Sequence, residues 1–340
     1  MKKSLSFLAV GASLLFAVGC GTTTNNTATN GTTSSNATSA TGSTSNKQIT
    51  IGFVPGVTTD PFFISMEVGA EQEAKKLGVN LDWESGSQYA PSVQTPYINA
   101  MVTKKVDALI ICPTDATAMI PPIKQAVQAG IPVITADSTI SDTSLLTSRI
   151  TSNNIQGGAA AADYLAKAAN GKKGVVAILD PSPGITTDAG RVKGFAQEIK
   201  KYPNLTYVGV QYDNEQTTKA ATLAQNLLLR YPNLVGIFGT DDTSASGAAE
   251  GVRSAGKLGS VKIVGYDAEP AEIADLKSGL ISALIAQKPM EEGKLAVEYA
   301  YDKVTGKTSK INSFLQLKNI IITKGNLQQN QQWVYKSSAN

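Results

Sequence analysis

The stretch 51–63 constrains the fold of this chain more than any other part of its sequence. Its first four residues are apolar and are typical of a short buried strand. Two prolines and a glycine then interrupt the strand, and Phe62 and Phe63 begin a helix. A strand that leads through a loop into a helix is the first unit of an open α/β sheet, whose ligands bind at the carboxyl ends of its strands. Asp60 and the two rings therefore lie at a predicted ligand-binding edge, although each ring could instead serve only as helix core.

The rest of the chain repeats this alternation of apolar runs and helical stretches. Strands are predicted at 49–54, 79–83, 106–111, 131–135, 146–151, 174–179, 205–210, 234–239, 261–266, 281–286 and 315–322. Helices are predicted at 64–77, 95–104, 121–129, 155–169, 188–201, 216–230, 243–255, 270–277 and 290–304, the second and third starting at first-turn prolines. This order predicts an α/β fold of two Rossmann-like lobes, each a parallel sheet flanked by helices.

The N-terminus has the features of an export signal. Two lysines precede an apolar stretch, 5–18, that is too short to span a bilayer comfortably. The sequence Ala-Val-Gly-Cys at 17–20 resembles a bacterial lipobox, which implies a lipoprotein signal peptide at 1–19 and lipidation of Cys20. An ordinary secretory signal followed by a spare cysteine is the alternative.

Residues 20–47 are expected to form a disordered tether. The segment 21–46 consists almost entirely of Ser, Thr, Asn, Gly and Ala, without a charge or an aromatic ring. Such a composition cannot bury enough apolar surface to offset the entropy cost of ordering. It suits a flexible link between a lipid anchor and a folded domain.

The composition argues against several functions. The chain has no histidine, the commonest general base and zinc ligand. Its net charge of +3 includes Lys2 and Lys3 of the signal segment, so the mature surface is close to neutral and no nucleic-acid partner is expected. We also expect no cofactor and no metal, although neighbouring carboxylates such as Asp241 and Asp242 leave a metal open. Cys112 is predicted to be buried and unpaired.

Acids and amides follow almost every predicted strand. They are Asp60, Asp137 with Ser138, Asp180 with Arg191, Glu215, Asp241, Asp267 and Gln287. Carboxylates accept hydrogen bonds from neighbouring hydroxyl groups, arginine donates in a planar fork, and rings stack on apolar C–H faces. We therefore expect a cleft that binds a polyhydroxylated ligand. Asp115, Asp188, Asp213 and Asp242 are interpreted as helix N-caps instead.

An ordered series of motifs resembles one family. The series runs Asp-Pro-Phe-Phe at 60–63, Cys-Pro-Thr-Asp at 112–115, Gly-Ile-Pro-Val-Ile-Thr-Ala-Asp at 130–137, Ser-Asn-Asn at 152–154, Gly-Phe at 194–195, Gln-Asn-Leu-Leu at 225–228, Val-Gly-Tyr-Asp at 264–267 and Ala-Gln at 286–287. Over about residues 49–322 it resembles the ribose-binding-protein group, the type I solute-binding components of bacterial ABC sugar importers.

This resemblance implies two lobes, joined by three hinge strands, that close on a sugar. The N-terminal lobe would comprise 48–152 plus 288–315, the C-terminal lobe would comprise 153–287 plus 316–335, and the hinges would fall near 152–153, 287–288 and 315–317. The implied ligand-binding positions are Asp60, Phe62, Phe63, Asp137, Ser138, Arg191, Glu215, Asp241, Asp267 and Gln287. The resemblance also implies a monomer that docks on a membrane permease.

Four of these positions depart from the ribose-binding pattern. They are Asp60 and Asp241, where asparagine is usual, Glu215, in place of an aromatic residue, and Ser138, in place of an arginine. The cleft is therefore more acidic, which suits another pentose, a hexose, a polyol or a sugar with a cationic group. Trp83 and Tyr89 would add a stacking face or serve in packing.

The predicted function is that of a lipid-anchored extracytoplasmic substrate-binding protein of an ABC importer, which captures a monosaccharide by lobe closure. One alternative is a sensor that passes sugar occupancy to a membrane receptor or kinase. Another is a glycosidase built from two of the carboxylates. The resemblance accounts for these acids without catalysis, so we expect no enzyme activity.

Overall fold

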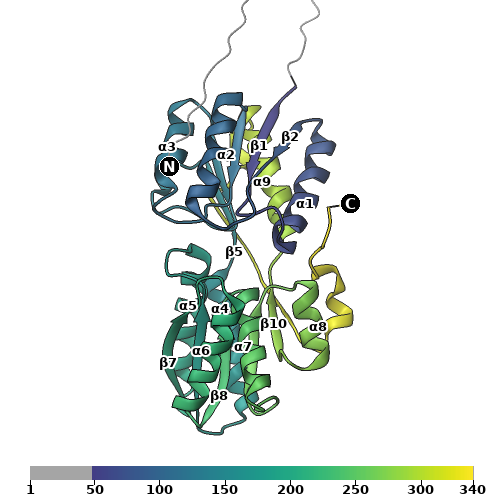
Figure 1. Cartoon of the computed structure of the whole chain (residues 1–340). Coiled ribbons are helices and arrows are strands. Elements are labelled where there is room, and N and C mark those ends of the chain that lie inside the picture. Colours follow the sequence, from purple (N-terminus) through teal and green to yellow (C-terminus); the bar gives the residue numbers. More distant parts are fainter. Residues whose placement is uncertain (1–47, 340) are drawn as a thin grey trace, which may run out of the picture. The chain divides into compact units, whose positions relative to one another are not determined.

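The computed structural model describes residues 48–339, and the predicted signal peptide, Cys20 and the tether lie outside the described residues. Within this range the chain forms two sheets of six strands each, with helices packed against both (Figure 1). Both sheets belong to one compact unit of the chain. The predicted α/β fold of two lobes with mostly parallel sheets is confirmed.

The N-terminal lobe contains the first sheet, whose strands are all parallel. In spatial order they are β11 (Phe314–Leu317), β5 (Ser148–Ser152), β4 (Val133–Ala136), β3 (Ala108–Ile111), β1 (Thr50–Val54) and β2 (Asn80–Trp83). The helices are α1 (Pro61–Leu77), α2 (Pro91–Lys104), α3 (Ile120–Gln128) and α9 (Pro289–Val304), with short 3-10 turns at η1 (Thr143–Leu145) and η3 (Thr308–Lys310). Every residue of β3 and β4 is buried, as expected for strands covered on both faces.

The C-terminal lobe contains the second sheet, in which β12 runs antiparallel to β10 and the other pairs are parallel. In spatial order its strands are β12 (Ile320–Ile322), β10 (Ala283–Ala286), β9 (Lys262–Tyr266), β8 (Leu234–Gly239), β6 (Gly174–Asp180) and β7 (Leu205–Tyr212). The helices are α4 (Asn154–Ala169), α5 (Thr186–Glu198), α6 (Thr217–Arg230), α7 (Asp242–Ser254) and α8 (Pro270–Ser278), with 3-10 segments at η2 (Ile199–Lys201) and η4 (Leu327–Trp333).

Three segments of the described chain connect the lobes. They follow β5 at Asn153, β10 at Gln287 and Lys288, and β11 at Lys318 and Asn319. The first and third lie side by side, because Asn319 Nδ2 donates to the Asn153 carbonyl oxygen at 2.8 Å. The second returns the chain to the N-terminal lobe, where α9 packs on α1.

The prediction of one strand at 315–322 is wrong. This stretch forms two strands in different sheets, with β11 paired to β5 and β12 paired to β10. The third connection therefore falls at 318–319, not at 315–317, and the N-terminal lobe extends to Leu317. Lys318 and Asn319 interrupt the apolar run at the connection, but two polar residues do not by themselves show that the chain passes to the other sheet.

The predicted start of α2 is also wrong. The helix begins at Pro91, which takes the first-turn position, and Pro96 lies inside it. A proline inside a helix removes one backbone donor. The lost bond is the one to the Ser92 carbonyl oxygen; the Thr95 Oγ1 hydroxyl donates instead to the Pro91 carbonyl oxygen at 2.7 Å.

The backbones of α1 and α9 pack closely against each other. A Cβ atom added at Gly69 would lie 2.0 Å from the Met290 carbonyl oxygen, and one at Gly293 would lie 2.2 Å from the Met66 carbonyl oxygen. Only glycine permits the two backbones to come this close. The middle of α1, one to two turns beyond Phe62 and Phe63, thereby packs directly on α9.

Cys112 is fully buried and forms no disulfide within the described part of the chain, and its Sγ lies 3.6 Å from Met66 Sδ. Among the described residues, no helix has the length and apolar character needed to cross a membrane.

Candidate functional site

A cavity of about 730 Å³ lies between the two lobes, where loops at the carboxyl ends of the strands meet. Nine of the ten predicted ligand-binding residues line it. They are Asp60, Phe62, Phe63, Asp137, Arg191, Glu215, Asp241, Asp267 and Gln287. The tenth, Ser138, lies outside the lining: it is 2% exposed, and its Oγ donates to the Pro113 carbonyl oxygen at 2.7 Å.

The N-terminal lobe supplies an aromatic wall. Phe62 and Phe63 come from the first turn of α1 and meet edge to face, with their ring centroids 5.1 Å apart. Tyr89 stacks beside Phe63 at 6.5 Å and also lines the cavity. Trp83 does not line the cavity, and its ring packs on Phe53 at 4.3 Å. The two phenylalanines are therefore both helix core and cavity wall.

Arg191 is held rigidly on α5. Its Nη1 donates to Asp188 Oδ1 at 2.9 Å and to the Thr240 carbonyl oxygen at 2.7 Å, and its Nε donates to Asn154 Oδ1 at 3.0 Å. The guanidinium also lies 3.7 Å from the ring centroid of Tyr266, a cation–π contact. These contacts use Nε and Nη1, which leaves Nη2 as the nitrogen that a ligand would meet.

Asp137 and Asp267 occupy matching places in the two lobes. Each directly follows a strand, β4 or β9, and each has a left-handed backbone, with φ of 61° and 87°. Such a conformation is uncommon for residues other than glycine and is often found at binding sites. Asp267 Oδ1 accepts from Gln287 Nε2 and from the Tyr335 hydroxyl, both at 2.7 Å.

Two buried acceptor atoms of the cavity lining have no hydrogen-bond partner. They are Asp137 Oδ1 and Gln287 Oε1, and their residues are 7% and 2% exposed. Buried polar atoms are normally hydrogen-bonded, because leaving one unsatisfied costs about 1–3 kcal/mol. A ligand that donates hydrogen bonds at this point would satisfy both atoms.

The assignment of helix caps differs from the prediction. Asp60 caps α1, accepting from the Phe62 N–H at 2.6 Å, and Asp241 caps α7, accepting from the Ser244 N–H at 2.7 Å. Asp188 and Asp242, interpreted from the sequence as caps, line the cavity instead. Where two acids stand side by side, as at 241–242, the sequence does not indicate which one caps and which one projects.

Sequence reasoning also missed Glu269 and Tyr335. Glu269 stands at the start of α8 and lines the cavity, and Tyr335 brings the C-terminal segment to the site. The Tyr335 ring packs against Phe62 at 5.7 Å, while its hydroxyl donates to Asp267. The glutamate before Pro270 was a usable signal for a residue at a helix start.

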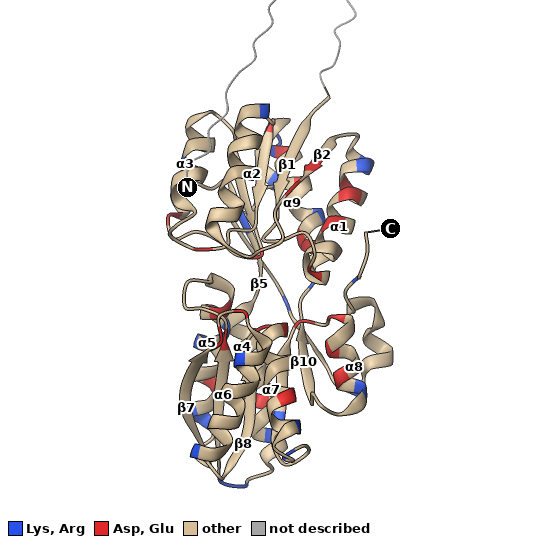
Figure 2. Ribbon diagram, in the orientation of Figure 1, with Lys and Arg blue, Asp and Glu red and all other residues tan. Residues whose placement is uncertain are grey.

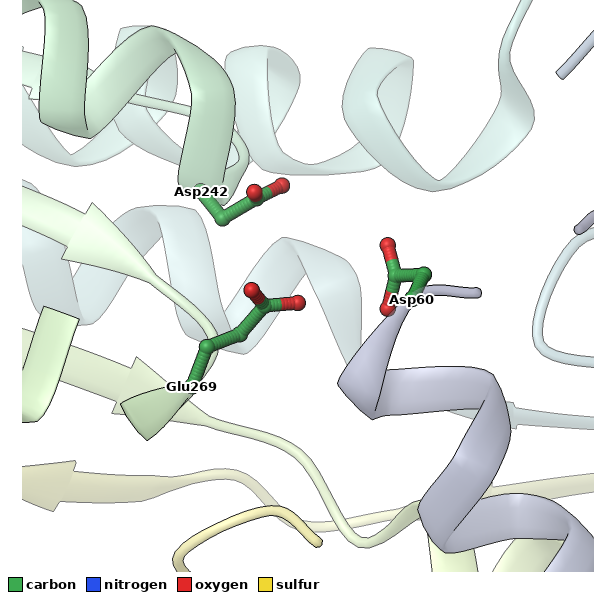
Figure 3. A group of neighbouring side chains, drawn as sticks. All are labelled: Asp60, Asp242 and Glu269. Carbon is green, nitrogen blue, oxygen red and sulfur yellow. The ribbon is translucent and has the colours of Figure 1, made fainter. Parts of the chain in front are cut away.

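Asp60, Asp242 and Glu269 form a three-carboxylate cluster. One oxygen from each lies within 4.8 Å of the other two, and the three side chains point into a common space (Figure 3). They come from the starts of α1, α7 and α8, so the cluster draws on both lobes. Acidic segments accordingly gather where the two lobes face each other (Figure 2). Of the described residues, these three are the ones placed to hold a metal ion.

Burial and mutual repulsion raise the pKa of several cavity carboxyls. Burial raises the pKa of Asp137 to about 7; Arg191 opposes this rise, and Asp267 and Asp60 add to it. Burial raises the pKa of Asp60 to about 6, with Asp267 contributing. It likewise raises the pKa of Asp241 to about 6. The ligand-free cavity therefore disfavours full ionisation of its acids at neutral pH.

Comparisons with known proteins give consistent matches. A family described as the periplasmic binding protein domain matches residues 51–308. The ribose import binding protein of Bacillus subtilis is 34% identical over 265 residues, which cover 78% of this chain and 85% of that protein. The ribose import binding protein of Salmonella typhimurium is 34% identical over 272 residues, covering 80% and 90%.

Solved structures agree. An ABC transporter solute-binding protein from Agrobacterium vitis, bound with α-D-tagatopyranose, is similar with a TM-score of 0.82 at 36% identity, covering 85% of this chain and 100% of that chain. A periplasmic solute-binding protein from Actinobacillus succinogenes with bound D-allose has a TM-score of 0.75 at 31% identity, covering 83% and 100%. These matches confirm the predicted fold and the resemblance identified in the sequence.

Proposed function

The chain belongs to the periplasmic binding protein family, and on that premise we propose that it is the substrate-binding protein of an ABC importer, with a monosaccharide or related polyol as its ligand. The pair of unpartnered acceptors, Asp137 Oδ1 and Gln287 Oε1, carries the proposal, because both belong to residues of the cavity lining and a ligand rich in hydrogen-bond donors would supply the partners they lack. The relatives support it, since their names and bound ligands are those of sugar carriers.

The composition of the cavity suits a sugar. The rings of Phe62, Phe63 and Tyr89 offer flat apolar surface to the C–H face of a pyranose or furanose. The carboxylates opposite them accept from hydroxyl groups, and Arg191 donates. The volume of about 730 Å³ falls within the usual range of small-molecule sites.

We propose that binding works by closure of the lobes about the three connections. Contacts from both lobes stabilise the closed state only when a ligand bridges them, which is a two-state hinge motion. Gln287 is part of one connection and also part of the cavity lining, where its Nε2 donates to Asp267 Oδ1 and its Oε1 has no hydrogen-bond partner. A ligand that contacts Gln287 would therefore act directly on one of the segments that join the two lobes.

Location and assembly are part of the proposal. Membership of this family supports an extracytoplasmic protein that acts as a monomer and delivers its ligand to a membrane permease. The lipobox-like segment supports anchoring through Cys20. Replacing this cysteine (Cys20→Ser) should move the protein from the membrane fraction to the soluble fraction, and continued membrane retention would exclude the lipid anchor.

A ligand screen tests the function. A thermal-shift panel of pentoses, hexoses and polyols should contain a ligand that raises the melting temperature, because a ligand at a hundred times its Kd stabilises by about 2.7 kcal/mol. For that ligand, Asp267→Asn should weaken the affinity measured by calorimetry at least about tenfold, since one good hydrogen bond to a charged group is worth about 1.5–3 kcal/mol.

Ser138→Ala is the matched control, because this residue neighbours Asp137 but lies outside the cavity lining. Its affinity should stay within a factor of about two of the unmodified protein, as a contact that is absent contributes no binding energy. A panel without any stabilising sugar or polyol would overturn the proposed function. An unchanged affinity in Asp267→Asn would overturn the proposed site.

A further inference from the structure

The charge of the cavity is strongly unbalanced. Eight carboxylates line it, and Arg191 is the one cationic side chain among the lining residues. This arginine is already paired with Asp188 at 2.9 Å. Most of the remaining acids therefore face the cavity without a cationic partner from its lining. Hydroxyl groups alone would satisfy the hydrogen bonds of such a site but would not neutralise its charge.

The geometry of the three-carboxylate cluster fits an ammonium group. An ammonium nitrogen donates three hydrogen bonds of about 2.8 Å. Its tetrahedral geometry then places the three acceptor atoms about 4.6 Å from one another. The oxygens of Asp60, Asp242 and Glu269 lie within 4.8 Å of one another, and in Figure 3 the three side chains converge from different elements on one space.

A second observation points to a ligand in the same cavity. Asp137 Oδ1 and Gln287 Oε1 are unpartnered acceptors on residues more than nine-tenths buried, and both residues line the cavity that the cluster shares. These atoms need donors that the protein does not provide. One ligand with hydroxyl groups and a separate positive group would satisfy both parts of the cavity.

From these observations we propose that the ligand is a polyhydroxylated compound that carries an amine, such as an amino sugar or an aminocyclitol, with its ammonium group bound by Asp60, Asp242 and Glu269. This inference rests on the proposed function and narrows its ligand class. The cluster has members from both lobes, so the ammonium group joins them. Without it, burial and the neighbouring acids raise the pKa of Asp60, Asp242 and Glu269, so bringing the two lobes together requires these carboxyls to take up protons or to repel one another.

A divalent cation fits the cluster less well. Calcium takes six to eight oxygen ligands. The cluster offers three side chains, and one oxygen of Asp60 already accepts from the Phe62 N–H at 2.6 Å. An ammonium group needs only one oxygen from each carboxylate, which leaves this capping bond intact.

Matched sugars test the inference. The probes are glucose, galactose and mannose, their 2-amino-2-deoxy and 1-amino-1-deoxy derivatives, the N-acetyl forms, and calcium chloride alone. The affinity of the full-length protein for each is measured by calorimetry at pH 7. We expect at least one amino sugar to bind ten times or more tightly than its parent sugar, and its N-acetyl form, which has no charge, to lose that advantage.

Isosteric variants locate the effect. Glu269→Gln and Asp242→Asn keep the shape of the side chains and remove one charge each. Each should weaken binding of the preferred amino sugar at least tenfold and bring its ratio to the parent sugar towards one. Glu71→Gln, on the exposed surface of the same helix that Asp60 caps, is the control and should leave the ratio unchanged.

The outcomes distinguish failure of the amine inference from failure of the proposed sugar-binding function. If parent and N-acetylated sugars bind as well as their amino forms, the inference is overturned and the proposed function stands. If calcium alone stabilises the protein and neutral sugars bind only in its presence, the cluster is a metal site and the inference is again overturned. If no sugar of any kind binds, the proposed function fails and the inference fails with it.

Discussion

The two lobes share a scaffold but give the cavity different chemistry. Each provides an aspartate with a left-handed backbone after a central strand, Asp137 in one and Asp267 in the other. The helix that follows the first strand of each lobe then differs: α1, after β1, begins with two aromatic rings, whereas α5, after β6, carries the buried pair of Asp188 and Arg191. Six of the eight lining carboxylates belong to the C-terminal lobe, namely Asp188, Glu215, Asp241, Asp242, Asp267 and Glu269.

If a sugar binds as proposed, we expect this difference to orient it. Its apolar face would pack on the N-terminal wall, and its donor groups would point towards the C-terminal lobe. Mutations in the two parts of the site should also have different effects. The contribution of aromatic contacts depends on shape and buried area, whereas that of buried charges depends on their partners. Mutations can test this separation.

The largest effect is expected from removing Arg191. Its side chain is 5% exposed and pairs with Asp188, so Arg191→Ala leaves a buried carboxylate without its partner. Loss of one member of a buried pair costs about 3–5 kcal/mol, which urea unfolding would measure. Binding should be lost as well, since this arginine lies in the cavity lining.

Arg253→Ala is the matched control for this prediction. It removes the same kind of pair, three residues apart on a helix of the same lobe, but Arg253 is 55% exposed. Exposed pairs contribute only about 0–1 kcal/mol. Equal losses of stability in the two variants would show that the buried pair of Arg191 and Asp188 contributes no more to stability than an exposed pair.

A smaller effect is expected from pH. Burial raises the pKa of Asp137 to about 7, above its value in the unfolded chain. The folded protein then binds more protons than the unfolded chain, so the stability this group contributes is present below about pH 4 and is lost as pH rises through about 7. For this residue the loss is on the order of 2–4 kcal/mol. The ligand-free melting temperature should therefore fall between pH 5 and 8.

Asp137→Asn sharpens the same test, because an amide does not titrate in this range. Its melting temperature should fall less steeply with pH than that of the unmodified protein. This contrast also compares the lobes, since Asp137 Oδ1 has no hydrogen-bond partner whereas Asp267 Oδ1 accepts two hydrogen bonds. A melting temperature that rises from pH 5 to 8 would contradict the assignment.

The two lobes share a scaffold but differ in the side chains of the cavity, and the sequence predicts the first better than the second. Buried strands such as β3 are uniform apolar runs, so the alternation of strands and helices, and with it the two-lobe fold, was readable. The change of sheet at 318–319 was not, because a polar pair between two apolar runs does not show which sheet each run joins. The resemblance placed most of the cavity residues, but it gave no reason to include Asp242 or Glu269. Their place in the cluster depends on three helix starts meeting in space, which no local pattern encodes.

The smallest effect is expected from the aromatic wall. Phe63→Leu keeps an apolar side chain of similar volume but removes the flat face, so stability should change by less than about 1.5 kcal/mol. The affinity for the ligand found in the sugar screen should fall about tenfold, or about 1.4 kcal/mol, through loss of stacking. Phe53→Leu is the control: its ring is fully buried in the same lobe against Trp83 and does not line the cavity. It should cost similar stability and leave affinity unchanged. If both variants weaken binding equally, the N-terminal rings affect affinity by stabilising the packing of their lobe. Direct stacking on the ligand would then not distinguish the N-terminal side of the site from the C-terminal side.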